Sequence, residues 1–535
     1  MQRFKLSTAI AAAVMLLLPS ASLADDMSFM FRSHGVVVET GNVPSQPVPD
    51  TGDGLDVASA TFKVSVNKPF EFDLRNLVRS DGIDPSSVTF AVADGNTAPA
   101  WLTLAADGLL SGLPPLEETV DLTVRAKVGD RSVTRRYKLE VFNALLAKKV
   151  VTGDSTTCAI TLDDGAKCWG WGREGQLGNG NGANWSELPV RVSGLDGRVK
   201  DLAVGTTAVT TVCALLDDAT VSCWGRYPGN GSTMSRIPVA VPGLNNVTSI
   251  AVGNTHACAA KTDGSVWCWG DNPLGQRGTA LDGIALKPMR ADLVAPAIVS
   301  LSAGSQHTCG LTVTGAGYCW GNNGVGQLGN GTRSYDFQSN ILSPSPTATE
   351  VVGLTDIVQI SAGYYHTCAI DGSWRVYCWG SGMIGELGDR GANSPALLSP
   401  AEAVIISSAE SIAAGSQFSC AMSAGSVKCW GWGRGGRLGI GTDANWEWPN
   451  STFPLPDIEI ENGYIEPSTS PSSDEAAPVV GMQSGVSHIS VSTRGGCGLM
   501  TDQRVKCWGE NYPGRIGDGT DVDRWSPVYV RSGEP

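Results

Sequence analysis

Cysteines are the residues whose spacing most directly predicts a chemistry in this sequence. The 14 cysteines fall into pairs, six with partners ten positions apart and one with partners nine apart. Paired thiols can hold a metal, but zinc sites use cysteines two to four positions apart that converge in fours. A separation of ten instead suits a β-hairpin with the two cysteines opposite each other, within disulfide reach. We therefore predict seven local disulfides: Cys158–Cys168, Cys213–Cys223, Cys258–Cys268, Cys309–Cys319, Cys368–Cys378, Cys420–Cys429 and Cys497–Cys507.

Histidines are the other residues that could do chemistry, and their positions argue against catalysis. Three of the five stand two positions before the first cysteine of a pair; the five are His34, His256, His307, His366 and His488. Because this repeated placement spreads them through the chain, we expect hydrogen bonds within each repeat and no shared metal. Nucleophile-elbow, phosphate-loop and His-Glu-x-x-His motifs do not occur. Residues 170–175 match a dinucleotide fingerprint, but no helix follows. We predict no enzyme activity, no cofactor and no metal.

A repeat positions these cysteines. Trp-Gly follows every second cysteine, and the second cysteines recur at intervals of 55, 45, 51, 59, 51 and 78 residues. Each pair brackets a hairpin, as in Cys258 to Cys268 with its Asp263-Gly264 turn, where glycine suits the left-handed position. Asp164-Gly165 and Asp371-Gly372 are interpreted in the same way, and the shorter pair Cys420–Cys429 requires a different turn. A Gly-rich loop such as Gly326-Gln327-Leu328-Gly329 comes next. This period predicts an all-β repeat architecture.

The repeated pattern Ala-Gly-x-x-His-Thr-Cys-Ala, then Cys-Trp-Gly-x-Asn-x-x-Gly-Gln-Leu-Gly, resembles the regulator of chromosome condensation repeat family. The resemblance covers about 146–533 in seven copies, with the second copy degraded after Trp224. It implies a seven-bladed β-propeller of four-stranded blades. The paired cysteines resemble those of the family's exported bacterial branch.

The resemblance implies a fold more strongly than a function. The founding member is a guanine-nucleotide exchange factor, which needs a cytoplasmic or nuclear location and a basic surface. Other relatives bind proteins, including an exported inhibitor of β-lactamase. We expect an exported, non-enzymatic binding or adhesion protein with a protein or cell-surface glycan partner. The alternatives are an inhibitor of an exported enzyme and, less favoured, an exchange factor.

The region before the repeats predicts export and a separate domain. Residues 1–24 have the charged start, apolar stretch and small-residue cleavage site of a signal peptide. A Pro/Gly-rich linker is expected at 25–58. Residues 59–143 show strand-like segments, and 99–114 resemble the immunoglobulin/cadherin-like modules of bacterial surface proteins, which implies a β-sandwich. No later segment is long and apolar enough to span a membrane.

Charge narrows the class of partner. The chain has 38 basic and 52 acidic residues, a net charge of −14, and no basic runs. Nucleic acids and anionic membranes are recognised largely through lysine and arginine, so neither is an expected partner.

Departures from the repeat are the candidate binding residues. Tryptophans outside the Trp-Gly positions concentrate in copies one, six and seven: Trp171, Trp185, Trp432, Trp446, Trp448 and Trp525. These copies are neighbours in a closed ring, so equivalent loops would bring Trp185, Trp446 and Trp525 to one sector of one face. Clustered exposed aromatics mark binding surfaces, for proteins or for sugar rings. The alternative is that these side chains fill gaps between blades.

The long last interval reflects an acidic insertion at about 440–480. Residues 440–493 contain eight acids and no lysine or arginine. With a Ser/Thr/Pro run at 467–473, the insertion is expected to be a mobile loop. It is either a site for a basic partner or a plain solvated loop. The sequence leaves the partner and the oligomeric state open.

Overall fold

The computed structural model describes residues 30–33, 36–39, 55–66, 69–79, 82–115, 118–206, 210–336, 341–342, 345–389, 396–403, 406–441 and 472–533. The chain divides into two compact units between residues 143 and 144. Over the described ranges it is an all-β structure, with three short 3-10 helices: η1 (Leu74–Leu77), η2 (Pro85–Ser87) and η3 (Arg434–Gly436). No described helix is long and apolar enough to cross a membrane. The predicted signal peptide, 1–24, lies outside the described residues.

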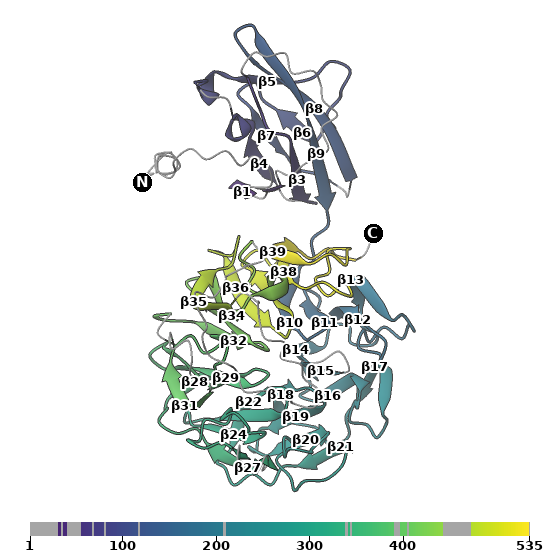
Figure 1. Cartoon of the computed structure of the whole chain (residues 1–535). Helices are drawn as coiled ribbons and strands as arrows, with labels where there is room; N and C mark the ends of the chain where they lie inside the picture. The colour runs from purple at the N-terminus through teal and green to yellow at the C-terminus, as the bar shows by residue number, and fades with distance from the viewer. Residues whose placement is uncertain are drawn as a thin grey trace, which may run out of the picture. The chain divides into compact units, whose positions relative to one another are not determined.

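The N-terminal unit packs two sheets on one hydrophobic core, as predicted for a β-sandwich. The larger sheet has the order β1-β2-β3-β9-β8-β5 and the smaller one β4-β7-β6 (Figure 1). Phe62 of the first sheet and Phe72 of the second are fully buried, with ring centroids 5.1 Å apart. The strands are β1 (Met30–Ser33), β2 (Val36–Glu39), β3 (Ala60–Ser65), β4 (Phe70–Asp73), β5 (Thr89–Val92), β6 (Leu102–Leu104), β7 (Leu109–Gly112), β8 (Glu118–Val128) and β9 (Arg131–Phe142).

Part of the expected linker is strand. β1 and β2 lie within 25–58, and β2 pairs antiparallel with β3, Val38 opposite Phe62. The reason lies in the sequence itself, because a run of three valines favours extended backbone and an open sheet edge offers it a partner.

The second unit contains seven four-stranded antiparallel sheets among its described residues, here numbered sheets 1 to 7 in chain order. Sheets 1 to 3 are β10 (Ala147–Thr152), β11 (Thr156–Thr161), β12 (Ala166–Trp171), β13 (Trp185–Arg191); β14 (Val199–Val204), β15 (Thr211–Leu216), β16 (Val221–Arg226), β17 (Met234–Ala240); and β18 (Val247–Val252), β19 (His256–Lys261), β20 (Val266–Gly270), β21 (Ala285–Arg290). Sheets 4 and 5 are β22 (Ile298–Ala303), β23 (His307–Thr312), β24 (Gly317–Gly321), β27 (Ser345–Glu350); and β28 (Ile357–Ala362), β29 (His366–Asp371), β30 (Val376–Ser381), β31 (Ala396–Glu402). Sheets 6 and 7 are β32 (Ser411–Ala414), β33 (Phe418–Ser423), β34 (Ser426–Trp432), β35 (Ser472–Pro478); and β36 (Val486–Val491), β37 (Gly495–Met500), β38 (Val505–Gly509), β39 (Arg524–Tyr529). A small extra hairpin, β25 (Tyr335–Asp336) and β26 (Ile341–Leu342), interrupts sheet 4.

The sheets follow one another around a ring and form a β-propeller (Figure 1). The first strands of successive sheets contact one another, so they line the centre, and the fourth strands lie outside. Serines on the first strands link neighbouring sheets: the hydroxyls of Ser302 and Ser361 accept the backbone N–H groups of Ala362 and Ala414, at 2.9 and 3.0 Å. The last sheet is joined to the first in the same way, since Ser490 accepts the N–H of Thr152 at 3.0 Å.

The predicted disulfides are all present. In each sheet the two cysteines are directly opposite on the second and third strands, as with Cys258 and Cys268, and their Cα atoms are 4.0–4.1 Å apart. The left-handed residue of the ten-position hairpins is always six positions after the first cysteine, and it is glycine only at Gly264 and Gly315. The assignment of this role to Gly165 and Gly372 was therefore wrong, because Asp164 and Trp374 occupy that position.

The tryptophan of each Cys-Trp-Gly triplet is the centre of the packing between sheets. All seven are fully buried: Trp169, Trp224, Trp269, Trp320, Trp379, Trp430 and Trp508. Each indole N–H donates to a backbone carbonyl in the connection between the third and fourth strands of the preceding sheet, as Trp379 does to Gln327 at 3.0 Å. Trp169 of sheet 1 donates to Arg515 of sheet 7 at 2.9 Å. The ring is thus closed by the same bond that joins its other neighbours.

Candidate binding surface

Two tryptophans predicted as binding residues project into solvent. Trp185 is 50% exposed and Trp525 is 46% exposed, large fractions for aromatic side chains. Both lie at the start of a fourth strand, at the end of the propeller that also carries the turns between first and second strands and the loops between third and fourth strands. We call this end the loop face. The opposite end carries the Cys-to-Cys hairpin turns.

Trp185 lies on β13 of sheet 1 and Trp525 on β39 of sheet 7, and these two sheets are neighbours in the ring. The loop of sheet 7 packs on β13: a Cβ added to Gly514 would lie 2.6 Å from the Cα of Glu187, two residues after Trp185. The loop of sheet 6 packs on β39, where a Cβ added to Gly436 would lie 2.8 Å from the Cα of Trp525. Only glycine permits such close backbone approach, so these loops are fixed against the strands that carry the tryptophans.

Trp185 and Trp525 do not occupy equivalent positions, contrary to the expectation. Trp185 pairs with Trp171, whereas the register of sheet 7, with Gly509 opposite Arg524, makes Trp525 equivalent to Glu187. The reason is that the connection between third and fourth strands differs in length from one sheet to the next. Trp446 and Trp448 lie outside the described residues.

Trp171 and Trp432 are half-buried. Each ends a third strand. The guanidinium of Arg437 stacks over the ring of Trp432, 4.1 Å from its centroid. The indole nitrogen of Trp171 is buried without a hydrogen-bond partner among the described residues. These two side chains therefore pack within the surface and do not protrude from it.

Tyr512 is an exposed aromatic that the tryptophan count missed. It is 64% exposed and belongs to the sheet 7 loop that packs on β13. We call Trp185, Tyr512 and Trp525 the aromatic sector. A count of every aromatic outside the repeat pattern, rather than of tryptophan alone, would have found Tyr512.

A charged network on the loop face joins sheets 6, 7 and 1. Glu510 accepts hydrogen bonds from Arg437 at 2.6 Å and from Arg494 at 3.1 Å, and Arg494 also pairs with Asp154 at 3.1 Å. Burial lowers the pKa of Arg437, and Glu510 opposes this shift. Arg515, fully buried, donates to the Glu510 carbonyl at 2.9 Å, and burial lowers its pKa to about 10. The network holds three loops in one arrangement.

The repeated histidines are structural, but their bonds cross between sheets. The Nε2 atoms of His256, His307 and His366 lie 2.8–2.9 Å from a hydroxyl of the next sheet, on Thr308, Thr367 and Ser419 respectively. The expectation of bonds within a repeat was wrong, because the second strand faces the neighbouring sheet. Burial lowers the pKa of His256 and His307 to about 3 and that of His366 to about 4, so the rings are neutral.

The remaining sequence candidates contribute little to this surface. His34 lies outside the described residues, and His488 is half-buried on β36. Of the acidic insertion, 442–471 lies outside the described part of the chain, and residues 472–478 form β35, the fourth strand of sheet 6. No group of three or more His, Cys, Asp or Glu side chains that could hold a metal occurs among the residues the structure describes.

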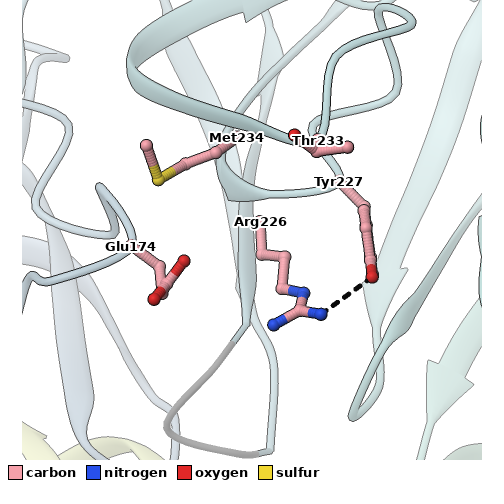
Figure 2. A pocket seen from close by; sticks show the side chains of 5 residues that line it. All are labelled: Glu174, Arg226, Tyr227, Thr233 and Met234. Atoms are coloured by element: carbon pink, nitrogen blue, oxygen red, sulfur yellow. Dashed lines mark hydrogen bonds between the residues drawn. The ribbon is translucent and has the colours of Figure 1, made fainter.

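A pocket of about 350 Å³ opens between sheets 1 and 2 (Figure 2). It is lined by Glu174, Arg226, Tyr227, Thr233 and Met234. Glu174 comes from the Gly-rich loop of sheet 1, and the other four surround the connection between β16 and β17. The pocket therefore opens on the loop face, beside the sheet that carries Trp185.

Comparison with known families agrees with these features. Two sequence models described as "Regulator of chromosome condensation (RCC1) repeat" match the chain, one at 147–176, 247–276 and 298–327, the other at 168–212 and 314–370. A model described as "Putative Ig domain" matches 53–142.

Individual relatives are more distant. The ultraviolet-B receptor UVR8 of Arabidopsis thaliana is 30% identical over 261 residues, 47% of this chain and 56% of UVR8. The human E3 ubiquitin-protein ligase HERC2 is 29% identical over 38% of this chain and 4% of HERC2. The chain thus spans about half the length of UVR8 and a small part of HERC2.

Among solved structures, yeast RCC1 (Prp20) bound to Kap60 aligns with a TM-score of 0.56 at 18% identity, over 72% of this chain and 85% of that one. Human WBSCR16 aligns with a TM-score of 0.54 at 17% identity, over 71% of this chain and 94% of that one. These likenesses establish the propeller fold.

Proposed function

We propose that this chain, which carries regulator of chromosome condensation repeats, is an exported, non-enzymatic binding protein whose loop face captures a protein partner. The observation that carries the proposal is the aromatic sector. Trp185, Tyr512 and Trp525 are each 46–64% exposed; loops pack against the strands that carry the two tryptophans, and Tyr512 belongs to one of these loops. Aromatic side chains of this kind dominate the energetics of protein interfaces.

The surroundings of the sector favour binding over a purely structural role. An exposed tryptophan leaves a large apolar area in water, which burial by a partner would stabilise at about 25 cal/mol per Å². Arg437, Glu510, Arg494 and Asp154 fix the loops in advance, so a partner loses less conformational entropy on docking. A relative with the same fold, yeast Prp20, is known in complex with Kap60.

Seven disulfides support the export part of the proposal, because such bonds persist in oxidising compartments. A guanine-nucleotide exchange factor would need a reducing location beside its GTPase. That activity is not favoured for this chain.

The test is affinity capture of exported proteins with three forms of the full chain: wild type, the double variant Trp185→Ala/Trp525→Ala, and Trp374→Ala. Trp374 is a matched control, because it is 52% exposed but lies at a hairpin turn on the opposite face. We expect one protein to bind the wild type and the control, with affinity for the double variant reduced by about 30-fold or more. Equal binding to all three forms would refute the assignment of the site, and retention of a glycan in place of a protein would refute the partner class.

A further inference from the structure

The pocket between sheets 1 and 2 results from a local loss of the repeat. In sheet 1 the third strand ends at Trp171 and the fourth begins at Trp185, whereas in sheet 2 these positions are Arg226 and Met234. The short connection omits the Gly-Gln-Leu-Gly turn found in sheets 1 and 4. The missing turn leaves the hollow of about 350 Å³.

Two opposite charges stand on facing walls of this hollow (Figure 2). The guanidinium of Arg226 lies 4.8 Å from the ring centroid of Tyr227 and donates one hydrogen bond to its hydroxyl, at 2.9 Å. The backbone N–H of Glu174 is bonded to Gln176 at 3.0 Å, which fixes the loop that carries its carboxylate. No ion pair joins Glu174 or Arg226 to each other or to another described residue.

The pair is particular to this junction. At the corresponding places between sheets 3 and 4 stand Leu274 and Asn322, and between sheets 4 and 5 stand Val325 and Ser381. Neither junction has opposed charges. The repeat therefore does not require Glu174 and Arg226 for folding, and their presence calls for another explanation.

We infer that this pocket binds a free α-amino acid as its zwitterion. The carboxylate is recognised by the Arg226 guanidinium, whose planar fork of donors is suited to two parallel hydrogen bonds. The ammonium is recognised by the Glu174 carboxylate. The ligand's side chain packs against Met234, which is 37% exposed and whose thioether adapts to apolar groups. A ligand with only one of the two charges would leave the opposite wall unpaired, and the volume accommodates a ligand of this size.

The first experiment titrates the full chain with leucine, N-acetyl-leucine and leucinamide by calorimetry and ligand-observed NMR. The acetylated compound lacks the ammonium, and the amide lacks the carboxylate. We expect saturable binding of leucine, and binding of either analogue weaker by about tenfold or more, since each loses a charge-assisted pairing. Equal binding of leucine and both analogues would overturn the inference that the ligand is recognised as a zwitterion. No detectable binding of leucine, methionine or phenylalanine at millimolar concentration would overturn the assignment of the pocket as an amino-acid site.

Variants then assign the two charges to the two walls. In Arg226→Gln, leucine and leucinamide should bind equally weakly, because the carboxylate no longer has its partner. In Glu174→Gln, leucine and N-acetyl-leucine should become equal for the corresponding reason. Arg173→Gln is the matched control, since Arg173 is an exposed neighbour of Glu174 outside the pocket lining, and it should bind as the wild type does. Unchanged leucine binding in Arg226→Gln, with the circular dichroism of all variants alike, would contradict the inference.

Discussion

Acidification should destabilise the propeller through its buried histidines. His256, His307 and His366 are buried and neutral, with pKa values lowered by burial to about 3, 3 and 4. In the unfolded chain a histidine has a pKa of about 6.5, so at pH 5 the unfolded state binds three protons that the folded state does not. Because the pKa values of the three histidines are depressed in the folded state, the stability that these neutral side chains contribute is fully present above pH 6.5. It is lost progressively as the pH falls.

The size of the loss depends on the unfolded-state pKa alone, as long as the pH stays above the folded-state values. From neutral pH to pH 5, each histidine costs about 1.36 × 1.5, or about 2 kcal/mol, and the three together cost about 6 kcal/mol. Glu386 changes the unfolding free energy in the opposite direction as the pH falls. Burial raises its pKa to about 7, so below that pH the folded state binds a proton more readily than the unfolded state and regains about 2 kcal/mol by pH 5. The net loss from these four groups is about 4 kcal/mol, and His488, whose pKa is also lowered by burial, adds to this loss.

Two variants separate the opposing contributions. His307→Gln should reduce the loss of unfolding free energy between about pH 7.5 and pH 5 by about 2 kcal/mol, and Glu386→Gln should increase this loss by about 2 kcal/mol. Glutamine is compatible with the Glu386 site, because Gln176, Gln276 and Gln327 occupy the same place in other sheets. The assay is guanidinium unfolding followed by tryptophan fluorescence, with the disulfides intact. If His307→Gln has the same pH dependence as the wild type, the reasoning about neutral histidines is refuted.

Three further predictions concern the ring and its staples. Glu510→Ala should lower the unfolding free energy by about 3 kcal/mol, because Arg437, with a side chain 9% exposed, loses its carboxylate partner; unchanged denaturant midpoints would show that the pair contributes nothing. Replacing Cys309 and Cys319 together with serine should cost about 2–3 kcal/mol on the chain-entropy estimate for a short loop, and an unaltered melting temperature under non-reducing conditions would contradict it. Gly514→Ala should cost about 1–3 kcal/mol, since its φ is +79° and its Cβ would meet the backbone of β13; a thermal melt matching the wild type would argue against this close approach.

The features that recur in every repeat, the hairpins and their disulfides, could be predicted from the sequence. Cysteine spacing predicted opposite positions on a hairpin, and all seven disulfides follow from it. The nine-position pair was expected to need another turn. It has a two-residue connection, Ala424-Gly425, with positive φ at both residues, which is the signature of a type I′ turn. These features are local, so residue type and spacing determine them.

The errors arose where position in the register overrides residue type. Asp164 and Trp374 are left-handed although a glycine is adjacent or two residues away, because the hairpin fixes the turn position relative to the cysteine. Likewise, His307 bonds to Thr367, 60 residues later, because the second strand of one sheet faces the next. The first fact depends on the register of the hairpin, which residue type alone does not set. The second cannot be deduced from one repeat, since it depends on how sheets are paired in space.

The candidate binding features follow from the same distinction between repeated and unrepeated residues. Within the ring, each sheet must present a buried tryptophan, a carbonyl acceptor and a disulfide to its neighbours, and this requirement leaves the interior little freedom to acquire a function. This requirement does not apply to Trp185, Trp525 and Arg226, because they lie where the connection between third and fourth strands changes in length. The aromatic sector and the charged pocket both lie on the loop face for this reason. Substitutions there should therefore alter binding while leaving stability nearly unchanged, which is the opposite of what is expected for the buried repeat positions.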